Sequence, residues 1–149
     1  MKNIILLVVT FLIGCAEVPI YTEFGKKNYD EKDYVTFETE THANQANRRW
    51  ADSEANLNLI RIDGKKIGNK AFSTYYYKND SPQKAVLVPG THTVELEYEV
   101  NLKYLFMTFE FEGVAGQKII AKTQYIGLDR VKLWLEDAAT GVKIGRMIK

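Results

Sequence analysis

Two runs in the second half of the chain alternate between apolar and polar side chains. Residues 93–100 read Thr-Val-Glu-Leu-Glu-Tyr-Glu-Val, and residues 105–112 read Leu-Phe-Met-Thr-Phe-Glu-Phe-Glu. A period of two matches a β-strand, in which successive side chains point to opposite faces of a sheet, and not the longer period of a helix. Each run is therefore predicted to be a strand with one buried face and one polar face.

Turn signals separate further runs that are rich in β-branched and aromatic residues. Asp63-Gly64 is typical of a tight hairpin, because both central positions of that turn need a positive φ. In Pro89-Gly90, proline fixes its own φ and glycine supplies a positive one. This spacing predicts a mainly β protein, an antiparallel β-sandwich or small barrel of about eight or nine short strands. Strands are expected within residues 34–40, 57–62, 73–77, 85–88, 93–100, 105–111, 118–126, 131–136 and 142–147.

The sequence pattern of one segment fits both a helix and a loop. Residues 42–55 are mostly polar, and their few apolar side chains are poorly spaced for an amphipathic helix. Either a short helix or a long polar loop fits them, so the chain is expected to hold at most one short helix.

The start of the chain has the order of a secretory signal. Lys2 and the free amino group precede an apolar run from Ile4 to Ile13 that only Thr10 interrupts. Ten helical residues span only about 15 Å, roughly half of a bilayer core. Residues 12–15, Leu-Ile-Gly-Cys, resemble the lipobox of bacterial lipoproteins. The resemblance implies that residues 1–14 are a lipoprotein signal peptide, removed before a lipid-bearing Cys15.

Lipidation would place the protein in the cell envelope, because two or three acyl chains give stable anchoring. The same resemblance implies sorting to the outer membrane in a cell with two membranes, since Ala16 rather than Asp follows the cysteine. Residues 15–33 show neither strand nor helix period and are predicted to be a lipidated tether. Residues 34–149 then form a single β-sandwich domain.

The composition argues against several kinds of chemistry. Cys15 is the only cysteine, and the only histidines are His42 and His92. The sequence holds no nucleophile elbow, phosphate-binding loop or zinc-protease helix. Its 20 basic and 19 acidic side chains provide no basic field of the kind that nucleic-acid binding requires. We therefore expect a protein that is not an enzyme and uses no metal, cofactor or nucleic acid, with His92 in a hydrogen-bonded structural role.

A family resemblance supports this interpretation. Residues 59–68 (Leu-Ile-Arg-Ile-Asp-Gly-Lys-Lys-Ile-Gly), followed by residues 86–96 (Val-Leu-Val-Pro-Gly-Thr-His-Thr-Val-Glu-Leu), resemble PEGA-type β-sandwich domains. These small envelope modules join a strand, an Asp-Gly turn and a Pro-Gly turn to an alternating strand. The similarity covers roughly residues 57–100, without the Thr-Pro pair often seen after the first hairpin. It implies a sandwich and an envelope role, and it transfers no catalytic residue.

The glutamates of the two alternating runs are expected to share one sheet face if those strands are neighbours. Carboxylates in rows along strands point outward and do not wrap around an ion, so a solvated, charge-paired face is predicted in place of a Ca²⁺ site. The glutamates are Glu95, Glu97, Glu99, Glu110 and Glu112, with Lys118, Lys122 and Lys132 as the expected partners.

Two aromatic features are candidates for a binding surface. Consecutive strand residues alternate faces, so Tyr75, Tyr76 and Tyr77 cannot all be buried on one face of a strand. Trp134 lies between Leu133 and Leu135 and is expected on the face opposite to theirs. Exposed aromatics suit peptide anchoring or stacking on sugars, while the alternative is that the tyrosines only fill the core and a sheet edge.

Together these observations predict a non-enzymatic, lipid-anchored envelope protein. Its expected role is binding or assembly, either docking another envelope protein or assisting a secretion or surface machine. A glycan- or peptidoglycan-binding module that uses the Tyr75–Tyr77 run is the first alternative. A hydrolase with an unrecognised site is the second. The sequence identifies no specific partner.

Overall fold

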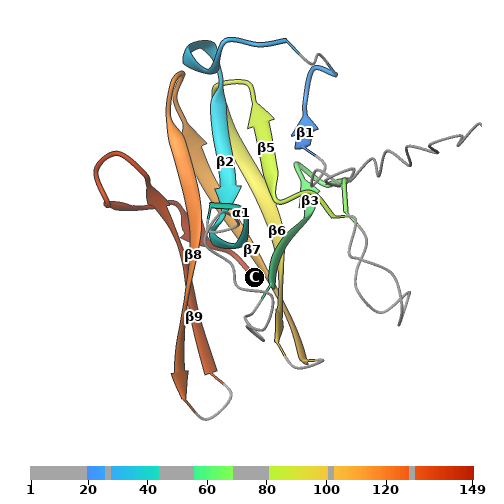
Figure 1. Ribbon diagram of the computed structural model, residues 1–149, viewed down its shortest axis with the longest axis vertical. Coiled ribbons are helices and arrows are strands. Elements are labelled where there is room, and N and C mark those ends of the chain that lie inside the picture. Colours follow the sequence, from blue (N-terminus) through green and yellow to red (C-terminus); the bar gives the residue numbers. More distant parts are fainter. Residues whose placement is uncertain (1–19, 26–27, 44–55, 69–80, 101–102, 128–129) are drawn as a thin grey trace, which may run out of the picture.

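Two β-sheets lie face to face in the computed structural model (Figure 1). The structure describes residues 20–25, 28–43, 56–68, 81–100, 103–127 and 130–149. The first sheet runs through β1 (Ile20–Thr22), β5 (Lys84–Leu87), β2 (Val35–Thr39), β8 (Lys118–Gly127), β9 (Arg130–Asp137) and β10 (Lys143–Ile144). The second runs through β11 (Arg146–Met147), β7 (Lys103–Gly113), β6 (Gly90–Val100), β3 (Asn56–Ile62) and β4 (Lys65–Lys66). The sandwich, the first of the two predicted architectures, is confirmed. It is not wholly antiparallel as predicted, because β2 pairs with β8, and β1 with β5, in parallel.

The core forms between the inner faces of the two sheets. The alternation in β6 and β7 is largely as predicted, because Val94 and Leu96 are buried on one strand and Phe109 and Phe111 on the other. Leu105, near the start of β7, was expected on the buried face but is 42% exposed. The Phe111 ring packs against that of Phe37, at 5.6 Å between centroids, and so joins the second sheet to the first. Further core side chains include Val35, Leu57, Leu59, Ile62, Leu87, Ile119, Leu133 and Leu135.

Both predicted turn pairs occur with positive φ. Asp63 and Gly64 have φ of 49° and 76°, and they join β3 to β4 in an antiparallel hairpin. Gly90 has φ of 149°. Pro89 and Gly90 lead from β5 in the first sheet to β6 in the second, so this turn passes the chain between the two layers.

The N-terminal segment is more closely attached to the domain than the predicted tether implies. Strand β1 pairs in parallel with β5, and a 3-10 helix, η1 (Glu31–Asp33), follows. The ring of Phe24, in this segment, stacks on that of Tyr34, the first residue of the predicted domain, at 4.3 Å between centroids. The described part of residues 15–33 therefore belongs to the folded domain, because β1 adds its backbone hydrogen bonds to the sheet edge.

The C-terminal segment crosses from one sheet to the other. The sequence predicts one strand within residues 142–147, whereas the structure splits it into β10, paired with β9, and β11, paired with β7. Gly145 lies at the crossing with φ of 68°. A Cβ atom there would lie 2.7 Å from the carbonyl oxygen of Glu110, so only glycine fits.

Two other predicted segments lie largely or wholly outside the described residues. The helix α1 comprises Glu40–Ala43, so it includes the first two residues of the segment 42–55. Residues 44–55 and the expected strand at 73–77 lie outside the described residues.

Candidate binding surface around Trp134

Trp134 lies on the outer face of the first sheet. Leu133 and Leu135 are buried in the core on either side of it along β9, and Trp134 itself is half-buried on the opposite face. The predicted orientation is confirmed. Its consequence is that a large aromatic side chain is available at the surface of the sheet, near the edge where β10 is attached.

Two polar side chains contact the tryptophan, and a third lies opposite it on the neighbouring strand. The indole Nε1–H donates a hydrogen bond to Oε2 of Glu136, at 3.2 Å. Lys143, from β10, places its Nζ 4.7 Å from the centroid of the ring, where the ammonium is attracted by the π face. Lys122 is the residue directly opposite Trp134 on β8. The tryptophan therefore has contacts with side chains of β9 and β10 and lies beside a lysine of β8.

A carboxylate from α1 marks the border of this surface. Strand β2 ends at Thr39, and beyond it Oε2 of Glu40 accepts hydrogen bonds from the backbone N and from Oγ1 of Thr123, at 2.9 and 3.0 Å. Its Oε1 lies 3.8 Å from Nζ of Lys122. Glu40 thus caps the part of the β8 edge that β2 leaves uncovered.

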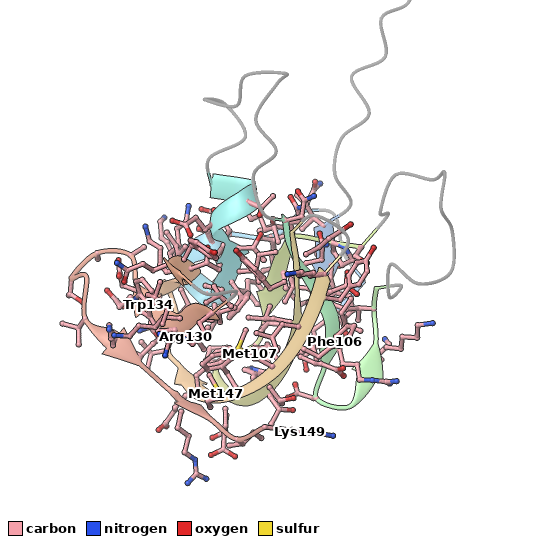
Figure 2. The ribbon with its side chains drawn as sticks, turned by 90° about the horizontal axis from the view of Figure 1, so that it is seen from below. Phe106, Met107, Arg130, Trp134, Met147 and Lys149 are labelled. Atoms are coloured by element: carbon pink, nitrogen blue, oxygen red, sulfur yellow. The ribbon has the colours of Figure 1, made fainter. Side chains whose placement is uncertain are left out.

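The surface around Trp134 is positively charged. Arg130 and Lys132 are exposed and precede Trp134 at two-residue spacing on β9, so all three share a face. Figure 2 shows Arg130 and Trp134 together on this strand. Four cations face two carboxylates, and we call this set the Trp134 patch. It comprises Lys122, Arg130, Lys132, Trp134 and Lys143, with Glu40 and Glu136.

The remaining predicted site residues lie outside the described residues. This holds for Cys15 and for Tyr75, Tyr76 and Tyr77. Their roles stay predictions.

The glutamate face differs from its prediction in two respects. Glu97 is completely buried, opposite Asn58 on β3, so it is not solvated. The expected lysine partners belong to the other sheet, where Lys118 pairs with Glu38 at 3.0 Å. Arginines on neighbouring strands of the second sheet pair with the glutamates instead: Arg61 with Glu95 at 3.0 Å and Arg146 with Glu110 at 2.7 Å.

His92 is buried, as expected for a structural histidine. Its Nδ1 lies 2.7 Å from Oδ2 of Asp63, and its Nε2 lies 2.8 Å from the carbonyl oxygen of Val88. Both ring nitrogens therefore face acceptors, which favours the doubly protonated ring. Burial lowers the pKa of His92, but the hydrogen bonds to Asp63 and Val88, with the charges of Asp63 and Glu23, outweigh it and raise the pKa above 6.5.

This arrangement predicts a pH-dependent stability. Because the folded protein holds the His92 proton more tightly than the unfolded chain, the stabilisation is complete below pH about 6.5 and is lost as pH rises through the higher folded-state pKa. His92→Leu should lower the free energy of unfolding at pH 6 by about 1.5–3 kcal/mol, the value of a charged hydrogen bond. Urea titrations between pH 6 and 9 measure both effects.

A second variant controls for lost packing. Asp63→Asn keeps a side chain that tolerates positive φ but removes the charge, so it should flatten the same pH dependence. If the free energy of unfolding changes with pH between 6 and 9 in the same way for the wild type and for both variants, the protonated His92 is contradicted.

Neither protein-family models nor curated proteins nor solved structures give a match to this chain. The resemblances to lipoproteins and to PEGA-type domains therefore stay predictions. Among the described residues, no helix has the length and apolar character needed to span a membrane. Within the same residues, no group of three or more histidine, cysteine, aspartate or glutamate side chains is arranged to hold a metal ion.

Proposed function

We propose that the protein is a lipid-anchored component of a bacterial envelope whose β-sandwich docks another envelope protein without catalysing a reaction. One observation supports the docking most strongly: the half-buried Trp134 lies on an open sheet face among cations. Tryptophan is enriched among the residues that dominate protein interfaces. Positive charge around it speeds the encounter with an acidic partner. The anchoring rests on the lipobox-like residues 12–15.

The surroundings of Trp134 favour a protein partner over a glycan. A sugar ring that stacks on tryptophan needs a bare face of the indole. Here Lys143 lies over the ring, with Nζ 4.7 Å from its centroid. An acidic protein surface can draw this lysine into an ion pair and cover the ring at the same time, which uses both the charge and the apolar area of the patch.

In-cell photo-cross-linking tests this proposal. A photoreactive residue at Gln124, which is exposed and lies opposite Lys132 on β8, should give a discrete adduct with one envelope protein. Lys132→Glu should reduce that adduct about tenfold, a loss of about 1.4 kcal/mol in binding free energy, because it places a negative charge against an acidic partner. Mass spectrometry identifies the adduct.

Two controls make the result specific. Lys32→Glu makes the same charge change at an exposed residue of η1 and should leave the adduct unchanged. A photoreactive residue at Glu112, exposed on the other sheet, should not give it. If the adduct persists in Lys132→Glu, or forms equally from both positions, the Trp134 patch is not the docking surface. Sedimentation with purified sacculi would favour the glycan alternative.

A further inference from the structure

One side of the sandwich brings together the edges of both sheets. β1 is the edge strand of the first sheet, and β4 is the edge strand of the second. Lys65 of β4 places its Nζ 5.6 Å from the centroid of the Tyr21 ring on β1, so the two edges lie side by side. The opposite edges, β10 and β11, adjoin Gly145 on the other side. We call the first of these the β1–β4 side.

The β1–β4 side carries exposed cations and exposed apolar side chains. Lys65 and Lys66 are both exposed, and Ile20 and Val88 are 48% and 40% exposed. The backbone N–H of Val88 donates to Oε2 of Glu23, just after β1, at 3.0 Å, which places Val88 beside that strand. This mixture of lysines and aliphatic side chains suits the interface of an anionic membrane.

Two acidic side chains in the described part of this side, Asp63 and Glu23, are already engaged. Asp63 accepts from the backbone N of Thr93 at 2.7 Å and lies 2.7 Å from Nδ1 of His92. Glu23 accepts from the backbone of Val88. Both carboxylates accept hydrogen bonds from the domain itself, whereas Lys65 and Lys66 of the hairpin are exposed cations.

The short chain between the proposed lipid on Cys15 and β1 limits how far β1 can lie from the membrane. Four residues, 16–19, separate Cys15 from Ile20. Five extended steps span at most about 18 Å. A sheet of six strands is wider, about 24 Å from edge to edge at the usual strand spacing. An anchor at Cys15 therefore holds the β1 edge near the membrane, while the β10 edge reaches it only if the domain lies flat.

We propose that the β1–β4 side rests on the anionic surface of the membrane, with Lys65 and Lys66 against lipid headgroups. This inference rests on the proposed anchoring at Cys15. It also gives the protein a fixed orientation, because the opposite edges, β10 and β11, then point away from the membrane, together with Trp134 on the adjoining strand β9. Figure 1 shows β1 and the β8–β9 hairpin on opposite sides of the domain.

Fluorescence quenching in vesicles tests the orientation with the full lipidated protein. Val88→Cys and Val142→Cys make the same substitution at residues 40% and 58% exposed, on the β1–β4 side and beside β10 respectively. Cys15 is the only native cysteine, so once it carries lipid the introduced thiol alone takes the fluorophore. The vesicles contain phosphatidylglycerol, phosphatidylcholine and a lipid with a nitroxide on its headgroup.

Quenching should be several-fold stronger at position 88 than at position 142. Adding Lys65→Glu and Lys66→Glu should reduce that difference, because the glutamates repel phosphatidylglycerol while the short tether still holds β1 near the membrane. Equal quenching at both positions overturns the orientation while leaving the anchoring intact. No effect of the double substitution overturns the contact of Lys65 and Lys66 with the lipid headgroups. No quenching at either position, together with an intact mass that shows no lipid on Cys15, overturns the anchoring and the orientation with it.

Discussion

Replacing Phe37 by alanine is expected to lower the free energy of unfolding by about 3–5 kcal/mol. Phe37 is fully buried in β2, between β5 and β8, and its ring stacks on Phe111 of the second sheet. Truncation removes apolar burial and leaves a cavity between two sheets that cannot easily collapse, because their backbones are fixed by hydrogen bonds on both sides of β2. Urea denaturation followed by circular dichroism measures the loss.

Tyr125 provides the matched control, since it is an aromatic residue of β8 that is 64% exposed. Tyr125→Ala should change the free energy of unfolding by no more than about 0.5 kcal/mol. A loss below about 1 kcal/mol for Phe37→Ala, similar to that for Tyr125→Ala, would contradict the two-sheet core.

Replacing Cys15 by alanine is expected to remove the protein from the membrane as a mature lipoprotein. Alanine has no sulfur to receive the diacylglyceryl group, so lipoprotein-type cleavage before residue 15 should fail. The variant should accumulate as an uncleaved precursor or as a soluble form, and detergent phase partition followed by immunoblotting distinguishes these from the wild type.

Ala16→Ser serves as the control, because it changes the neighbouring residue and leaves the cysteine intact. It should be processed and partition like the wild type. If Cys15→Ala still partitions into detergent as a mature acylated species, the anchoring proposal is lost.

The sequence predicts the strands that have a clear local pattern. Alternation places β6 and β7, and β-branched or aromatic runs place β2, β3, β5, β8 and β9 close to their observed bounds. The Asp63-Gly64 hairpin follows from local turn chemistry, since both residues adopt positive φ. In each case the deciding interactions lie within a few residues of the chain.

Elements that depend on distant partners were not predictable in this way. Strand β1 is three residues long and exists because its backbone pairs with β5, more than 60 residues later in the chain (Ile20 with Lys84). The division of β10 from β11 depends on the close approach of Gly145 to Glu110, which no local pattern reveals. Such features follow from the assignment of strands to sheets.

The charged residues and the candidate site also depend partly on local pattern and partly on pairing between distant strands. The period of two gives the face of Trp134 correctly, but Lys143 reaches the ring only because β10 pairs with β9. The expected pairing of Lys118 and Lys122 with the β6 and β7 glutamates is wrong, because these lysines lie on β8 in the first sheet, whereas β6 and β7 belong to the second. Glu97 is buried although its strand alternates, which shows that an outward face can itself be covered.

The intact mass of the protein extracted from membranes tests the central claim of a lipid-anchored envelope module most directly. We expect a chain that begins at Cys15 and is heavier than the unmodified polypeptide by a diacylglyceryl group and, where the new amine is acylated, by one further acyl chain. Fragmentation should place the added mass on residue 15. A protein that retains residues 1–14, or one that carries a free thiol at Cys15, would contradict it.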